Sequence, residues 1–152
     1  MLVHYVLGNY YEYGQLGLLR DRERAMELWK QAAALGSSHA HFELGSVYRE
    51  GGDLKKAKFH YEAAAMAGHE DARYNLGSTE AQSGNMGQAV KHWTIAASAG
   101  KYNAMKTLIK AIEMGYVSRA VIDSTLAAYN NSCIEIRSEA RDAFIRRFMI
   151  EN

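Results

Sequence analysis

A block of residues recurs every 32 positions in this chain, and this period constrains the fold more than any other feature. Gly36, Gly68 and Gly100 mark the period. Alanine, aromatic and leucine positions repeat in the same register: Ala25, Ala57, Ala89; Trp29, Tyr61, Trp93; Ala40, Ala72, Ala104; Leu44, Leu76, Leu108. A fixed period of this length is typical of repeat proteins, in which similar modules stack and bury a continuous core.

Each period contains two helical patterns. In the second repeat a helix is predicted over residues 38–50, and a second over residues 54–67. Asp53 is suited to cap the second helix, and Gly68 is suited to end it in a left-handed conformation. The chain contains no proline, the residue that breaks helix interiors. The sequence therefore predicts an all-α fold of stacked helix pairs.

We expect one domain over residues 1–152, with four repeats and a terminal cap. The predicted repeats cover 2–36, 37–68, 69–100 and 101–131, and a capping helix covers 135–150. The first repeat has an extended loop over 14–21, and the fourth departs from the pattern. The cap is predicted to carry the apolar stripe Ala140, Phe144 and Phe148.

A glycine recurs within the first helix of three repeats, as Gly8, Gly45 and Gly77. Glycine costs about 1 kcal/mol relative to alanine inside a helix. Its recurrence therefore predicts that a neighbouring helix backbone comes too close for a side chain. The large aromatic residues of the second helices are expected to fill the gaps between repeats.

These positions resemble the Sel-one-like repeat, a relative of the tetratricopeptide repeat. The first repeat matches through Leu7-Gly8-x2-Tyr11, Gly14, Gly17, Asp21, Arg24-Ala25, Trp29, Ala32-Ala33 and Gly36. The third departs at Glu80, where the family has a packing tyrosine. The resemblance covers about residues 3–115. It implies a right-handed superhelix of antiparallel helix pairs and an adaptor that holds other proteins in assemblies.

Charge and hydropathy disfavour two classes of partner. The formal net charge is +1, whereas a nucleic-acid surface needs an excess of Lys and Arg. We therefore expect no nucleic acid, and single-stranded RNA binding of the pentatricopeptide kind is a minor alternative. No apolar stretch reaches 18 residues and no signal-peptide pattern is present, so no membrane contact and a cytoplasmic location are expected.

Catalytic and metal-binding patterns are absent from the sequence. There is no Gly-x-Ser-x-Gly, phosphate loop or dinucleotide fingerprint. His39 and His41 lie two residues apart and point to opposite sides of a helix, and His60 and His92 lie one repeat apart. Cys133 is the only cysteine, which excludes a disulfide framework. We predict no enzyme activity, no cofactor, no metal and no small-molecule substrate.

In the related tetratricopeptide proteins the first helix of each pair lines a concave groove. Carried onto this sequence, the resemblance predicts a partner-binding groove at Tyr5, Asn9, Tyr13, Phe42, Ser46, Arg49, Tyr74, Ser78, Lys106 and Lys110. Tyr5, Phe42 and Tyr74 would form an aromatic row along it. The alternative is that these rings pack between adjacent first helices. Lys106 and Lys110 match only half of a carboxylate clamp, which is therefore disfavoured.

The sequence thus predicts a non-catalytic scaffold that binds a peptide or a partner helix in the groove. An alternative is a substrate-recruiting arm of a zinc-finger, ubiquitin-ligase-like protein, because some similar proteins carry such a module before the repeats. This sequence encodes no zinc-finger module.

Overall fold

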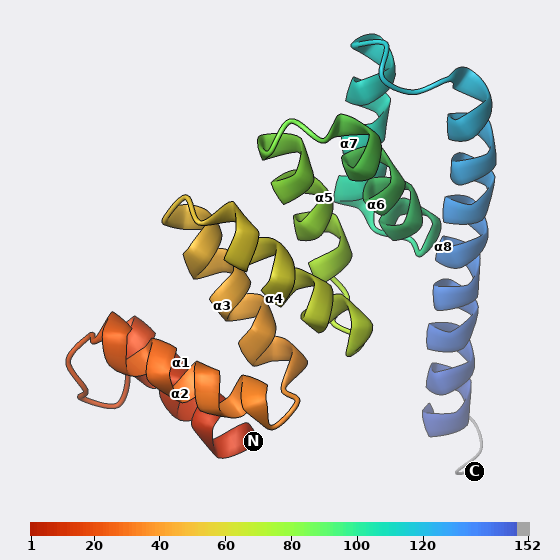
Figure 1. Cartoon of the computed structure of the whole chain (residues 1–152). Helices are drawn as coiled ribbons and strands as arrows, with labels where there is room; N and C mark the ends of the chain where they lie inside the picture. Colours follow the sequence, from red (N-terminus) through yellow and green to blue (C-terminus); the bar gives the residue numbers. More distant parts are fainter. Residues whose placement is uncertain (149–152) are drawn as a thin grey trace. The chain divides into compact units, whose positions relative to one another are not determined.

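Helices form successive pairs along the chain (Figure 1). The computed structural model describes the backbone of residues 1–148 and the side chains of residues 1–139. Within this part of the chain there are eight helices and no strand. They are α1 (Leu2–Tyr13), α2 (Arg22–Ala34), α3 (Ser38–Glu50), α4 (Leu54–Met66), α5 (Ala72–Gln82), α6 (Met86–Ser98), α7 (Tyr102–Glu113) and α8 (Arg119–Phe148). The fold is an all-α repeat solenoid, as predicted.

The chain divides into two compact units, Met1–Ala89 and Val90–Asn152. In the first unit each helix from α1 to α4 packs on the next one in sequence. In the second unit α7 packs on α8. None of the described helices is both long enough and apolar enough to cross a membrane.

Local chemistry determines where the helices of the first unit begin and end. The side chains of Asp21, Ser37 and Asp53 accept hydrogen bonds from backbone N–H groups three residues ahead, at 2.9, 3.3 and 3.1 Å. Gly68 has φ of 84°, a left-handed conformation that ends α4. The helix predicted over 38–50 is confirmed, and the one predicted over 54–67 ends one residue earlier, at Met66.

The extended loop of the first repeat is held by a buried carboxylate. Glu12 is 8% exposed and forms an ion pair with Arg20 at 3.0 Å. Arg22 lies 3.7 Å from the same carboxylate and also forms a hydrogen bond with Glu50 of α3. Arg20 therefore ties the loop to α1, and Arg22 of α2 ties that helix to both α1 and α3.

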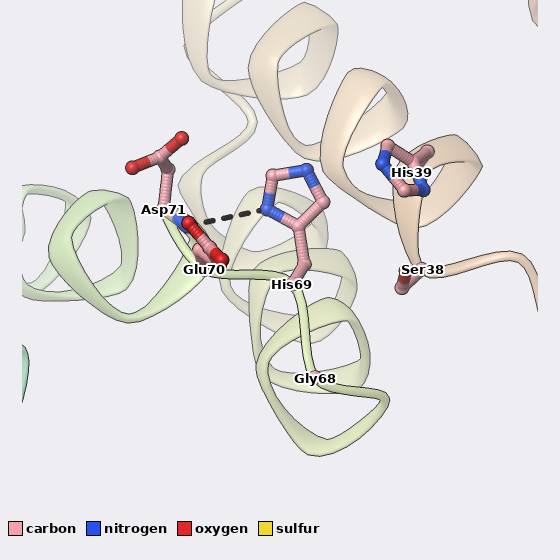
Figure 2. A pocket seen from close by; sticks show the side chains of 6 residues that line it. All are labelled: Ser38, His39, Gly68, His69, Glu70 and Asp71. Carbon is pink, nitrogen blue, oxygen red and sulfur yellow. Dashed lines mark hydrogen bonds between the residues drawn. The ribbon is translucent and has the colours of Figure 1, made fainter. Parts of the chain in front are cut away.

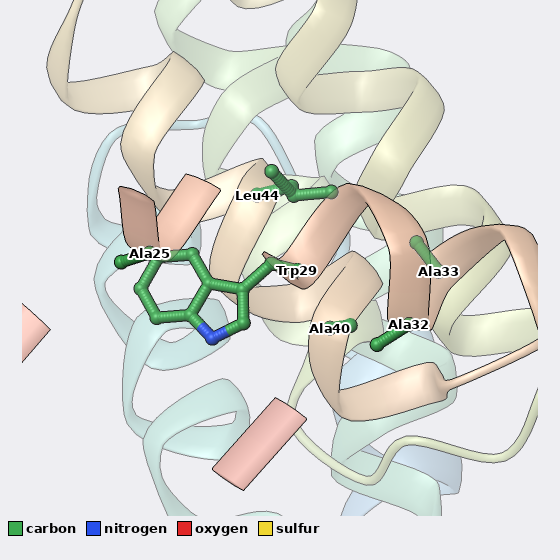
Figure 3. Packing of buried hydrophobic residues seen from close by; sticks show 6 residues of the cluster. All are labelled: Ala25, Trp29, Ala32, Ala33, Ala40 and Leu44. Atoms are coloured by element: carbon green, nitrogen blue, oxygen red, sulfur yellow. The ribbon is translucent and has the colours of Figure 1, made fainter. Parts of the chain in front are cut away.

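Two aromatic side chains occupy the space above the helix glycines. A Cβ atom at Gly8 would lie 2.6 Å from Trp29 Nε1, and one at Gly45 would lie 2.8 Å from Tyr61 Cδ1. Both distances are shorter than any real Cβ contact. The sequence correctly indicated a close approach, but the main obstacle is an aromatic ring of the same helix pair rather than a neighbouring backbone. Trp29 also contributes to the buried cluster that includes Leu44 of the next pair (Figure 3).

The C-terminal helix differs from the prediction. A second helix of the fourth repeat and a separate cap over 135–150 were expected, but α8 runs without a break from Arg119 to Phe148. The reason is local, because this segment contains no glycine or proline to end a helix. The predicted stripe Ala140, Phe144 and Phe148 lies outside the residues whose side chains are described.

The contact between Gly45 and Tyr61 makes a testable prediction about stability. Gly45→Ala should lower the free energy of unfolding by about 1–3 kcal/mol, because the added methyl group forces the ring to move. Gly87→Ala in α6 is the matched control, since nothing lies within 4 Å of its added Cβ. The control should be neutral or stabilising by up to about 1 kcal/mol, as helix propensity requires. Urea unfolding followed by circular dichroism measures both, and equal effects would contradict the packing account.

Candidate functional site

Four side chains of the first unit form a continuous array of rings. Tyr5 of α1 lies 5.4 Å from His39 of α3 between ring centroids, and His39 lies 5.0 Å from His69 in an edge-on contact. His69 stacks on Phe42 at 4.1 Å, with only 10° between the ring planes. We call these four residues the ring array. It connects α1, α3 and the segment between α4 and α5.

A hollow of about 300 Å³ lies beside the ring array. Figure 2 shows its lining, with His39 at the start of α3 and His69 on the connection that follows Gly68. The backbone N–H of Asp71 donates to His69 Nδ1 at 3.3 Å and fixes one side of that ring. The lining is completed by Ser38 and Glu70. The hollow thus combines imidazole faces with polar groups.

The three residues of the predicted aromatic row, Tyr5, Phe42 and Tyr74, are all half-buried. Phe42 contacts the fully buried Tyr61 edge-on at 5.7 Å in addition to His69. Tyr5 contacts His39, and Tyr74 lies on α5. Each ring is therefore partly buried and partly exposed. This result lies between the two alternatives from the sequence, which were exposure in the groove and packing between adjacent first helices.

Tyr13 is the most exposed predicted residue of the first unit, at 62%. The negative charge of Glu43 is the largest cause that raises the pKa of Tyr13, followed by burial and Glu12. Burial, with a smaller effect of Glu12, also raises the pKa of the Glu43 carboxyl. Glu43 of α3 therefore lies near the hydroxyl of Tyr13, whereas Glu12 is paired with Arg20 and Arg22. Arg49 is half-buried in the last turn of α3.

Two predicted groove residues have a structural role. Asn9 Oδ1 accepts a hydrogen bond from Trp29 Nε1 at 3.0 Å, and the hydroxyl groups of Ser46 and Tyr61 are hydrogen bonded at 3.0 Å. Asn9 and Ser46 occupy the same repeat position, and each satisfies the polar atom of a buried aromatic residue. Ser78, the third member of that row, donates to the carbonyl of Tyr74 in its own helix at 3.2 Å.

The predicted lysines belong to the other unit. Lys106 and Lys110 are exposed on α7. They therefore do not belong to the surface of the first unit.

The sequence reasoning missed the histidines of the ring array. His39 and Phe42 are three residues apart on α3, a spacing that places them on the same helix face and could have been noticed. His69 lies outside any helix, so no periodicity indicated its direction. His39 and His41 point apart, as predicted, because the ring of His39 contacts His69 whereas the ring of His41 contacts His60.

A second histidine pair joins α3 to α4. The Nδ1 atoms of His41 and His60 lie 3.0 Å apart, and Tyr48 stacks on His60 at 5.4 Å. Burial, with smaller contributions from His41 and Lys30, lowers the pKa of His60 to about 4. The described residues include no group of three or more His, Cys, Asp or Glu that could hold a metal ion. The two neutral rings therefore form a hydrogen bond that joins α3 to α4.

Comparison with known protein families agrees with the resemblance described from the sequence. The family model described as "Sel1 repeat" matches residues 3–37, 38–69 and 71–101, which together exceed half of the chain. Among curated proteins, none matches.

Two solved structures are similar to this chain. A Sel1 repeat protein from Oxalobacter formigenes has a TM-score of 0.73 and 24% identity, covering 87% of this chain and 57% of that one. A protective antigen of uropathogenic Escherichia coli strains that displays an SLR fold has a TM-score of 0.67 and 26% identity. That match covers 89% of this chain and 33% of the antigen. This chain thus spans less than two thirds of either protein.

The hydrogen bond between Asn9 and Trp29 generates a prediction. Asn9→Ala should lower the free energy of unfolding by about 1–3 kcal/mol, because it leaves a buried N–H group without an acceptor. Ser78→Ala is the matched control, since that hydroxyl bonds only to its own helix and its loss should cost little. Thermal or urea unfolding measures both variants. If Asn9→Ala is as stable as the control, Asn9 does not have the structural role assigned to it.

The lowered pKa of His60 predicts how stability depends on pH. The unfolded chain, with a histidine pKa near 6.5, binds more protons than the folded chain between about pH 6.5 and pH 4. Stability should therefore fall as the pH falls through this window. Because the ring is only half-buried, solvent screening reduces the effect to about 1–2 kcal/mol. Histidine NMR titration checks the cause directly, and a ring of His60 that titrates near pH 6.5 would contradict it.

Proposed function

The chain belongs to the Sel1 repeat family, and from that premise we propose that it binds a peptide segment of another protein on its first unit. Proteins built from Sel1 repeats generally act as scaffolds for protein–protein interactions, and their fold is a typical non-catalytic interaction scaffold. The proposed binding surface consists of the ring array, the hollow beside it, and Tyr74, Tyr13 and Arg49. We call it the ring surface.

The observation that carries the proposal is the ring array itself. Aromatic side chains in partly desolvated positions are the usual anchors of protein interfaces, since they bury a large area at a small cost in conformational entropy. Tyr5, Phe42 and Tyr74 are half-buried, so each ring keeps part of its area available to a partner. Three such rings on successive first helices favour an elongated ligand over a small molecule.

The rings are also preorganised. Phe42 is held between His69 on one side and Tyr61 on the other, and Tyr5 is held by His39. A partner that binds such rings pays little entropy to order them, which increases the affinity gained per contact. The hollow between His39 and His69 would accept one side chain of the peptide. We expect that side chain to be aromatic or aliphatic, because it would pack against imidazole faces.

Asn9, Ser46 and Ser78 have a different role in this proposal from the one the sequence suggested. Their side-chain hydrogen bonds already lie within the protein. They are expected to hold the ring surface in place from the protein interior, through their hydrogen bonds to Trp29, Tyr61 and the helix backbone. The specificity of the scaffold would then come from the aromatic residues.

The experiment begins with selection of binding peptides from a random library on the wild-type protein. The affinity of a selected peptide is then measured by calorimetry. Tyr74→Ala should weaken binding by about 1–3 kcal/mol, the usual cost of truncating an interface anchor. The triple variant Tyr5→Ala, Phe42→Ala and Tyr74→Ala should abolish it.

The matched control is Tyr102→Ala, which removes a tyrosine that is 65% exposed on α7 of the other unit. Circular dichroism verifies that all variants remain helical. The proposal requires that the control binds like the wild type. It fails if folded Tyr74→Ala and triple variants keep full affinity, or if the Tyr102 variant loses as much.

A further inference from the structure

The first helix has an apolar face that the rest of its unit leaves uncovered. Leu2 and Val3 are 69% and 74% exposed, and Leu7 is 36% exposed. With Val6 and Tyr10 they line a hollow of about 330 Å³ that has no polar lining. We call these five residues the α1 outer face. None of its five residues belongs to the ring surface.

The repeats themselves show what covers such a face. Val3 and Leu7 occupy the positions of Ala40 and Leu44 in the second repeat and of Ala72 and Leu76 in the third. Those four residues are at most 3% exposed. Leu44 and Ala40 are buried in a cluster with residues of α2, and Leu76 is buried with residues of α4. In the second and third repeats, the equivalent face therefore packs against the second helix of the preceding repeat.

The covering helices share one pattern of small residues. The pattern is an alanine followed seven residues later by an alanine pair, as in Ala25-x6-Ala32-Ala33 and Ala57-x6-Ala64-Ala65. Ala32 and Ala64 are completely buried, and Ala32 belongs to the cluster that contains Ala40 and Leu44 of the next repeat. Small side chains permit the close approach that this packing requires. A helix suited to the α1 outer face should thus carry the same pattern.

The same chain carries this pattern on two further helices. On α6 it reads Ala89-x6-Ala96-Ala97, and all three alanines are buried. On α8 it reads Ala120-x6-Ala127-Ala128, and here Ala120 and Ala127 are exposed. Val121 beside them is 37% exposed. We call Ala120, Ala127, Ala128 and Val121 the α8 face. It has the residue pattern of a covering helix but is not covered.

We propose that two copies of this chain associate head to tail, with the α1 outer face of one copy packed on the α8 face of the next. The contact would repeat between molecules the packing that α2 and α3 make within one. The formal net charge of +1 opposes association only weakly.

A head-to-tail contact uses two different faces, so each complex retains one free α1 outer face and one free α8 face. Association therefore continues beyond the dimer, unlike a two-fold contact that buries the same face twice. This difference makes the proposal testable with variants that block one face at a time.

The test is sedimentation equilibrium of the whole chain over a range of concentrations. The wild type should exceed the 17.0 kDa mass of one chain as concentration rises. Val3→Lys with Leu7→Lys blocks the α1 outer face, and Ala127→Lys blocks the α8 face. Each variant should remain at 17.0 kDa when alone. An equal mixture should form dimers and stop there, since each variant supplies the face that the other has lost.

The matched control is Leu19→Lys, which changes an apolar residue that is 88% exposed in the loop of the first repeat. It should associate like the wild type. A wild type that stays monomeric up to about 1 mM overturns the proposal and leaves the α1 outer face to a different protein. An Ala127→Lys variant that still associates, or a folded mixture that stays monomeric, overturns the head-to-tail arrangement.

Discussion

The contact between a buried aromatic ring and a helix glycine is the interaction on which the first unit depends. Trp29 occupies the space where Gly8 has no side chain, and Tyr61 does the same at Gly45. The two helices of a pair can approach only because that space is free. Both rings are also buried with a satisfied polar atom, through Asn9 and Ser46. One contact thus determines the spacing of the pair and the direction of the first helix.

The direction of the first helices in turn determines which side chains remain for binding. His39 of α3 faces α1 and the α4–α5 connection, and Phe42 contacts both Tyr61 and that connection. Stacking of His69 on Phe42 connects the second helix pair to the segment that begins the third. The proposed ring surface is therefore a consequence of repeat packing, and it needs no additional element.

The sequence correctly predicted those structural features that depend on residues close together in the chain. The bounds of α3, the cap at Asp53 and the end at Gly68 depend on chemistry within a few positions, and all three were confirmed. The ring array and the contact of His41 with His60 depend on side chains that meet across helices, which a period of 32 does not specify. The break expected before the capping helix was wrong because no glycine or proline lies between Arg119 and Phe148 to end the helix.

The central claim is that a partner lies along the ring surface of the first unit. NMR of the isotope-labelled chain, with and without a selected peptide, tests this most directly. The account predicts that the largest shift changes occur at the rings of Tyr5, His39, Phe42 and His69. Changes confined to the opposite helices, at exposed residues of α2 and α4 such as Lys30 and Glu62, would contradict it.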